Sequence, residues 1–84
     1  MLVYVHLDGA TYPVETGTGV QAVRWLANVA MARHGGDRGA RLGEPVEMRM
    51  ETVDGPHLDA SEAIMASQLH DEAHVWVLFA SHFD

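Results

Sequence analysis

The chain lacks two residue types altogether, and each absence narrows its possible functions. Its 84 residues contain no cysteine, so neither a disulfide framework nor a thiolate metal site can form, and a cytoplasmic location is the expectation. All five basic residues are arginine, and lysine is absent. A chain without lysine cannot be modified on a side-chain amine, although a genome that prefers arginine codons would explain the same composition.

Positive charge and long apolar runs are also scarce. Twelve acidic residues against five basic ones give a formal net charge of −7. This balance argues against a nucleic-acid partner, whose phosphates require a basic surface, and favours basic partners. No apolar run approaches the roughly 20 residues that span a bilayer, so we expect no membrane partner. The length predicts a single domain over residues 1–84 with a small core.

Two strand signals open the chain. Residues 2–7 are apolar and rich in β-branched and aromatic side chains, and Asp8-Gly9 follows as a hairpin signal. Residues 12–15 form the predicted return strand. Pro13 lacks an N–H group, which places this strand at an edge of the sheet or at a bulge.

A helix and two further strands follow. The apolar spacing predicts a helix over residues 19–33, opened by a capping box of Thr18 and Gln21, with Val20 on its buried face. Residues 46–51 alternate, with Val46, Met48 and Met50 facing the core. Residues 56–58 are at most a short strand, a helical turn is expected near residue 61, and residues 74–80 read as a buried final strand.

The element order predicts an α+β fold. One helix cannot cover both faces of a sheet, so we expect a mixed sheet of four to five strands with the helix across one face. A right-handed crossover makes a later strand parallel to the first one. The first and last strands are the most apolar, and they are predicted to lie parallel at the centre. This architecture is a β-grasp.

The same ordered pattern resembles ubiquitin over the whole chain. The start Met1-Leu2-Val3-Tyr4-Val5, the hairpin, the helix opening Val20-Gln21-Ala22-Val23 and the turn Asp71-Glu72-Ala73 occur in the ubiquitin order. Leu58 and Val75 also keep the separation of the matching ubiquitin leucines. The resemblance implies a non-catalytic bacterial or archaeal protein modifier. Its C-terminus would be activated by E1-like and E2-like enzymes, set by a processing peptidase, and conjugated to a target protein.

The predicted conjugation tail departs from ubiquitin. It reads Ser81-His82-Phe83-Asp84 in place of Gly-Gly. The glycines of ubiquitin let its tail enter a narrow channel of the activating enzyme. A bulky Phe83 and a second carboxylate on Asp84 imply a wider channel, a processed terminus, or a protein that is not conjugated. With the final strand ending so close to it, the tail is expected to project from the domain.

Strand alternation predicts an interaction patch on the open face of the sheet. If Val75, Val77 and Phe79 point inward, then Trp76 and Leu78 point outward. By the same rule, outward positions are predicted for Tyr4 and His6, and Arg49 joins them from the neighbouring strand. A register shifted by one residue, or coverage by the Arg49 and Glu51 stems, would remove this patch. An exposed tryptophan among such neighbours is typical of a binding surface.

Three other motifs favour structural explanations. Residues 17–22 fit G-x-G-x-x-A, but so short a chain has no room for a dinucleotide-binding fold, and a turn with a helix cap explains the glycines. His70 and His74 are spaced like zinc ligands on a helix, but His74 enters a strand. The serines have no evident base or acid. We therefore expect no enzyme activity, no cofactor and no metal site.

Two alternatives to a modifier remain open. A non-covalent ubiquitin-like adaptor, of the kind found in bacterial secretion loci that also lack Gly-Gly, would act through the sheet patch. A homo-oligomer would form if Trp76 and Phe83 docked on a neighbouring copy. Unchanged function after deletion of residues 81–84 would favour the adaptor over the modifier.

Overall fold

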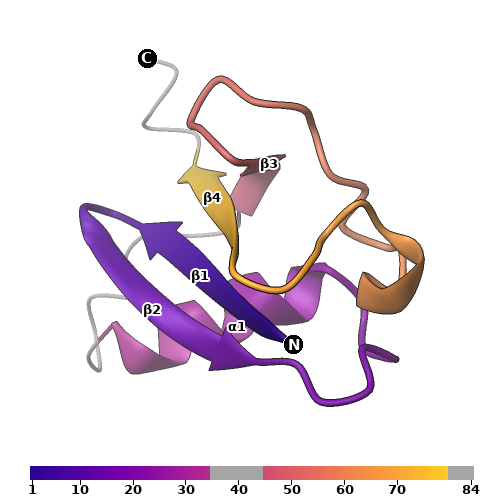
Figure 1. Ribbon diagram of the computed structural model, residues 1–84. Helices are drawn as coiled ribbons and strands as arrows, with labels where there is room; N and C mark the ends of the chain where they lie inside the picture. Colours follow the sequence, from indigo (N-terminus) through magenta and orange to yellow (C-terminus); the bar gives the residue numbers. More distant parts are fainter. Residues whose placement is uncertain (35–44, 80–84) are drawn as a thin grey trace.

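Four strands pair in the order β2-β1-β4-β3 in the computed structural model, which describes residues 1–34 and 45–79 (Figure 1). The strands are β1 (Leu2–Leu7), β2 (Ala10–Glu15), β3 (Pro45–Met50) and β4 (Ala73–Phe79). β1 is parallel to β4, whereas the other two pairs are antiparallel. With a single α-helix packed against β1 and β2, this is a ubiquitin-like β-grasp topology. The predicted fold class is confirmed, with four strands.

The hairpin between β1 and β2 forms as predicted. Asp8 and Gly9 both have positive φ, at 49° and 80°, which is the type I′ geometry that suits the twist of the flanking strands. Pro13 pairs with Tyr4 at a position without ladder hydrogen bonds, so its missing N–H group costs the ladder nothing. The Arg33 side chain donates to the outward Pro13 carbonyl at 2.5 Å. One carbonyl group on the edge of β2 therefore already accepts a hydrogen bond from within the chain.

The helix is shorter than the sequence predicted. α1 runs over Arg24–Arg33, so the prediction of a helix from residue 19 is wrong for its first five residues. Gly19 has φ of +75°, which breaks helical geometry there. Val20 is 67% exposed rather than buried. The predicted capping box is also wrong, because Val23 is the N-cap residue and no side chain caps it.

Backbone groups from a later segment take the place of the missing cap. The N–H groups of Val23 and Arg24 donate to the carbonyls of Glu62 and Ala60, at 2.8 and 2.9 Å. In return, the Ile64 N–H group donates to the Gln21 carbonyl at 2.8 Å. The bonds from Val23 and Arg24 satisfy N–H groups at the start of α1 that would otherwise need a polar side chain. The sequence pattern gave no sign of them, because the partners are some 40 residues away.

The core lies between the sheet and two covering segments. α1 covers β1 and β2, and the short 3₁₀ helix η1 (Ile64–Ala66) adds Ile64, which is fully buried. The predicted helical turn near residue 61 therefore lies a few residues later. Met48 and Met50 are buried as expected, whereas the Val46 side chain falls outside the described part of the chain. Residues 56–58 are not a strand, and they pair with β3 through the isolated bridge of Arg49 with His57. In residues 1–34 and 45–79, no helix is long and apolar enough to cross a membrane.

Hydrogen bonds among three side chains connect the C-terminal end of α1 to the hairpin. His34, at the C-cap of α1, forms a short hydrogen bond through Nδ1 with the Tyr12 hydroxyl. Its Nε2 lies 3.3 Å from an Asp8 carboxylate oxygen. Tyr12 also meets the imidazole edge-on, with ring centroids 5.8 Å apart. Three elements are thereby held at one corner of the domain.

We expect Tyr12→Phe to lower the free energy of unfolding by about 1 kcal/mol, because it leaves the part-buried His34 nitrogen without its partner. Urea unfolding at neutral pH measures the change. Tyr4→Phe, on the opposite face of the sheet, is the matched control and should change stability less. Equal losses from the two substitutions would contradict a stabilising role for this corner.

Candidate functional site

Four rings line up on the face of the sheet that α1 does not cover, which we call the outer face. Tyr4 and His6 come from β1, and His74 and Trp76 come from β4. The parallel register places Tyr4 beside His74 and His6 beside Trp76. The inward neighbours of these residues, such as Val5 and Val75, are fully buried in the core. Strand alternation therefore presents all four rings on one surface, which we call the ring column.

The rings of the column contact one another in sequence. The Tyr4 and His74 centroids are 5.0 Å apart with planes 22° from parallel. His6 and His74 follow at 5.1 Å and 28°, and His6 and Trp76 at 4.0 Å and 7°. Such aromatic contacts stabilise a pair beyond the area that they bury. Each ring is therefore held by a neighbour before any partner arrives.

Hydrogen bonds fix the two imidazoles of the column. His6 Nδ1 lies 3.0 Å from the Thr11 hydroxyl of β2, and His6 Nε2 lies 2.8 Å from His74 Nδ1. A hydrogen bond between two imidazole nitrogens needs one proton, donated by one ring to the lone pair of the other. Protonating both facing nitrogens would break it and bring two positive charges together.

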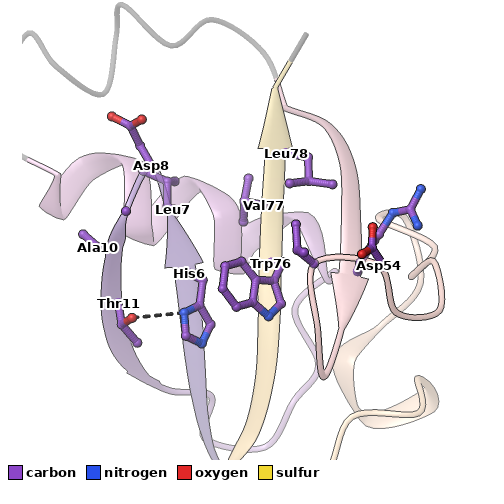
Figure 2. A pocket seen from close by; sticks show the side chains of 12 residues that line it. His6, Leu7, Asp8, Ala10, Thr11, Asp54, Trp76, Val77 and Leu78 are labelled. Atoms are coloured by element: carbon purple, nitrogen blue, oxygen red, sulfur yellow. Dashed lines mark hydrogen bonds between the residues drawn. The ribbon is translucent and has the colours of Figure 1, made fainter. Parts of the chain in front are cut away.

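A hollow of about 590 Å³ lies beside the column, at the end of the sheet where β1 and β4 finish. Figure 2 shows Trp76 between His6 and Asp54, with the dashed line marking the Thr11–His6 hydrogen bond. The indole Nε1 of Trp76 is buried and has no acceptor among the described residues. The hollow combines apolar and polar groups from all four strands and two turns. Its lining side chains include His6, Thr11, Arg49, Val53, Asp54, Trp76 and Leu78.

Charge around the hollow is predominantly negative. Arg49 donates from Nε and Nη2 to one oxygen of Glu47, at 3.0 and 2.9 Å. The other Glu47 oxygen lies 3.3 Å from His57 Nδ1. The one arginine of the lining is thus already paired, whereas Asp54 makes no ion pair with the described residues. Opposite charge on a partner would be attracted here, and salt would weaken that attraction.

The structure brings most of the predicted patch together and changes one part of it. Tyr4, His6 and Trp76 are partly exposed on the outer face, and Arg49 is paired across the ladder with Trp76. Leu78 is on the same face but is only 7% exposed, so it offers little apolar surface. The predicted conjugation tail, Ser81, His82, Phe83 and Asp84, lies outside the described residues.

Sequence reasoning missed two members of the site. It placed His74 next to His70 in a possible metal pair, whereas the structure joins His74 to His6, 68 positions away in sequence. His70 instead lies 3.0 Å from a Glu51 oxygen. Thr11, which holds His6, was also missed. Alternation along the last strand was the available signal for His74, and the cross-strand position opposite His6 was the signal for Thr11.

His6 and His70 make the stability of the fold depend on pH in opposite directions. Burial, and then the neighbouring His74, lowers the pKa of His6 below its ordinary value of 6.5. Hydrogen bonds to the Asp71 carbonyl and the Glu51 carboxylate raise the pKa of His70 above 6.5. A lowered histidine pKa means that the unfolded chain binds more protons, so stability falls as pH drops below about 6.5. The raised pKa of His70 contributes stability that is present below 6.5 and is lost as pH rises through its folded value.

We therefore expect His6→Gln to lose less stability than the unsubstituted chain between pH 7.5 and 5.5. His70→Gln should lose more over the same interval, because the group that gains stability on acidification is gone. Thermal unfolding across this pH range measures both slopes. Identical slopes for the two variants would contradict these assignments. The pKa values of Glu15 and Asp59 are lowered, so these carboxyl groups change stability only at more acidic pH and do not affect the two slopes.

Two motifs set aside at the sequence level have structural roles here. Thr16, Gly17 and Gly19 belong to the turn before α1, where the Gly19 N–H group donates to the Thr16 carbonyl at 3.1 Å. Ser61 donates through its N–H and hydroxyl groups to Asp59 Oδ1, at 2.9 and 2.6 Å, so Asp59 organises that turn.

Within residues 1–34 and 45–79, no three His, Cys, Asp or Glu side chains gather as metal ligands would.

Comparison with protein-family models, with curated proteins and with solved structures found no match to this chain. The β-grasp assignment therefore rests on the strand order, the parallel pairing of β1 with β4, and the helix across β1 and β2.

Proposed function

We propose that this chain is a non-catalytic ubiquitin-like protein that acts by being recognised, through the outer face of its sheet. The observation that supports this most is the ring column of Tyr4, His74, His6 and Trp76. Aromatic groups held rigidly at a surface lose little conformational entropy when a partner binds, which is one reason they dominate binding hot spots.

The surroundings of the column also suit a binding surface. The hollow beside Trp76 has room for a partner side chain, and Val53 at its margin is 43% exposed. The net charge of −7 favours a partner with basic groups near the hollow. We accordingly assign recognition to the outer face rather than to α1, whose apolar side chains pack in the core.

Photo-crosslinking in the native host tests this proposal. A photoreactive phenylalanine at Tyr4 should give defined protein adducts, identified by mass spectrometry. Asn28, exposed on α1, is the matched control position and should not give them. Met65 is a second control, because it is 68% exposed and apolar but lies in η1. Adducts from Met65 or Asn28 alone, with none from position 4, would contradict recognition through the outer face.

A finer form of the proposal is that the chain is a protein modifier. Its support is the ubiquitin-like strand order with β1 parallel to β4, together with a chain that has no lysine. The chemistry would belong to E1-like and E2-like enzymes and a processing peptidase, with the target's amine as nucleophile. The adaptor and self-assembly alternatives need only the outer face.

Incubation with ATP and a candidate activating enzyme separates these forms. A modifier should give an adenylate or a covalent adduct at its C-terminus, detected by intact-mass spectrometry. No adduct, together with unchanged function after deletion of residues 81–84, would remove the modifier form and leave recognition by the outer face intact. Elution of Trp76→Ala and the unsubstituted chain at the same volume at every concentration would remove self-assembly through Trp76.

A further inference from the structure

Two imidazole nitrogens from strands at opposite ends of the chain face each other on the outer face. We propose that His6 and His74 together form a binding site for a divalent transition-metal ion, with Cu(II) preferred. Imidazole nitrogen is a favoured ligand of Cu, Ni and Zn ions, and Cu(II) binds such donors most tightly of the three. The proposal does not depend on the recognition function above.

The distance between the nitrogens favours a square-planar ion. His6 Nε2 and His74 Nδ1 are 2.8 Å apart. Two nitrogens bound at about 2.0 Å and at a right angle to each other are separated by about 2.8 Å, which is the arrangement that Cu(II) or Ni(II) adopts. Tetrahedral Zn(II) needs a wider separation of about 3.3 Å.

Neighbouring groups already orient the two ligands. The Thr11 hydroxyl lies 3.0 Å from His6 Nδ1, the nitrogen that would not bind the metal. Hydrogen bonding of the second imidazole nitrogen is the usual way in which proteins fix the tautomer of a metal-binding histidine. The Trp76 ring covers one side of the pair, with its centroid 4.0 Å from that of His6. The Tyr4 ring covers the other side, with its centroid 5.0 Å from that of His74.

The protonation state suits metal binding at neutral pH. A ligating imidazole must be neutral, and the surroundings of His6 favour its neutral form. When both rings are neutral, binding an ion moves the proton of the His6–His74 hydrogen bond to the other nitrogen of its own ring, so no net proton is released. A proton on a ligating nitrogen competes with the ion for the same lone pair, so Cu(II) affinity should fall on acidification.

The protein supplies only these two ligands among its described residues, since no third His, Cys, Asp or Glu side chain joins them. The remaining positions of the ion would be open to water or to a group from another molecule. A site with this composition should bind reversibly, and it should expose the ion on the outer face rather than bury it.

Titration of the full chain with Cu(II) at pH 7.5, followed by calorimetry, tests the site. We expect His6→Gln and His74→Gln each to weaken Cu(II) affinity by about tenfold or more. The double variant should be no weaker than either single variant, because losing one ligand already destroys a shared site. His57→Gln and His70→Gln are the matched controls, since both histidines are exposed and lie near carboxylates, and they should stay within about twofold.

Electron paramagnetic resonance of the Cu(II) complex provides a second readout. The unsubstituted chain should show two coupled imidazole nitrogens, and each single variant at most one. Circular dichroism must show that the variants remain folded, and His6→Asn provides a replacement if His6→Gln does not. The proposal is overturned if the single variants bind Cu(II) as the unsubstituted chain does, if only one of the two histidines matters, or if their effects add as for independent sites.

Discussion

Phe79→Ala is expected to lower the free energy of unfolding by about 4 kcal/mol. Phe79 is fully buried at the end of β4, where it pairs with Pro45 of β3 and belongs to the main core. A chain of 84 residues has a total stability of only about 4 to 12 kcal/mol. The loss of one large core ring should therefore remove between about a third and all of that stability.

The conservative substitution separates volume from aromatic character. Phe79→Leu keeps most of the apolar volume and should cost less than about 1.5 kcal/mol. Chemical unfolding followed by circular dichroism compares the three chains. A loss below about 1 kcal/mol for Phe79→Ala would show that this end of β4 does not carry the core as described.

Gly55→Ala is expected to lower stability by about 3 kcal/mol, because there is no space for a side chain. A Cβ atom on Gly55 would lie 1.9 Å from the Met50 carbonyl oxygen and 3.1 Å from that of Thr52. Backbone must move to relieve the first contact. That movement would disturb the 2.9 Å hydrogen bond from the Met50 N–H group to the Pro56 carbonyl, which closes the edge of β3.

Gly17→Ala, in the turn before α1, provides a comparison at a glycine with open space around it. A Cβ atom there would meet nothing within 4 Å, and only the positive φ of 61° opposes the substitution. It should cost about 1 to 2 kcal/mol, the usual cost of the left-handed region for a residue with a side chain. Urea unfolding of both variants measures the difference. Equal losses at the two positions would contradict the close packing of Gly55 against Met50.

The fold could be predicted because its signals are local and agree with one another. The Asp8-Gly9 turn fixes the hairpin register, Pro13 marks the edge strand, and high apolar content marks the first and last strands as central. The start of α1 could not be predicted, because its first N–H groups bond to Ala60 and Glu62 through the backbone. A carbonyl contributed by a distant segment leaves no trace in the side-chain pattern.

The site was predictable as a face but not as a set of contacts. Alternation placed Tyr4, His6 and Trp76 outward, which follows from the two-residue period of a strand. The same rule applied to Leu78, but it says nothing about coverage by neighbouring chain, and Leu78 is only 7% exposed. The His6–His74 hydrogen bond depends on the register between the first and last strands, which only the assembled sheet defines.

The outer face is central to both proposals, and it depends on the parallel pairing of β1 with β4. That pairing brings residues from opposite ends of the chain within hydrogen-bond distance. Either proposal can fail separately: recognition without metal binding, or metal binding without a protein partner. Both fail if the ring column does not exist.

Nuclear Overhauser contacts in solution test the ring column most directly. We predict cross-peaks between the ring protons of His6 and Trp76, and between those of Tyr4 and His74. Cross-peaks from the Trp76 indole to the Leu26 methyl groups of α1, in place of those to His6, would contradict this prediction.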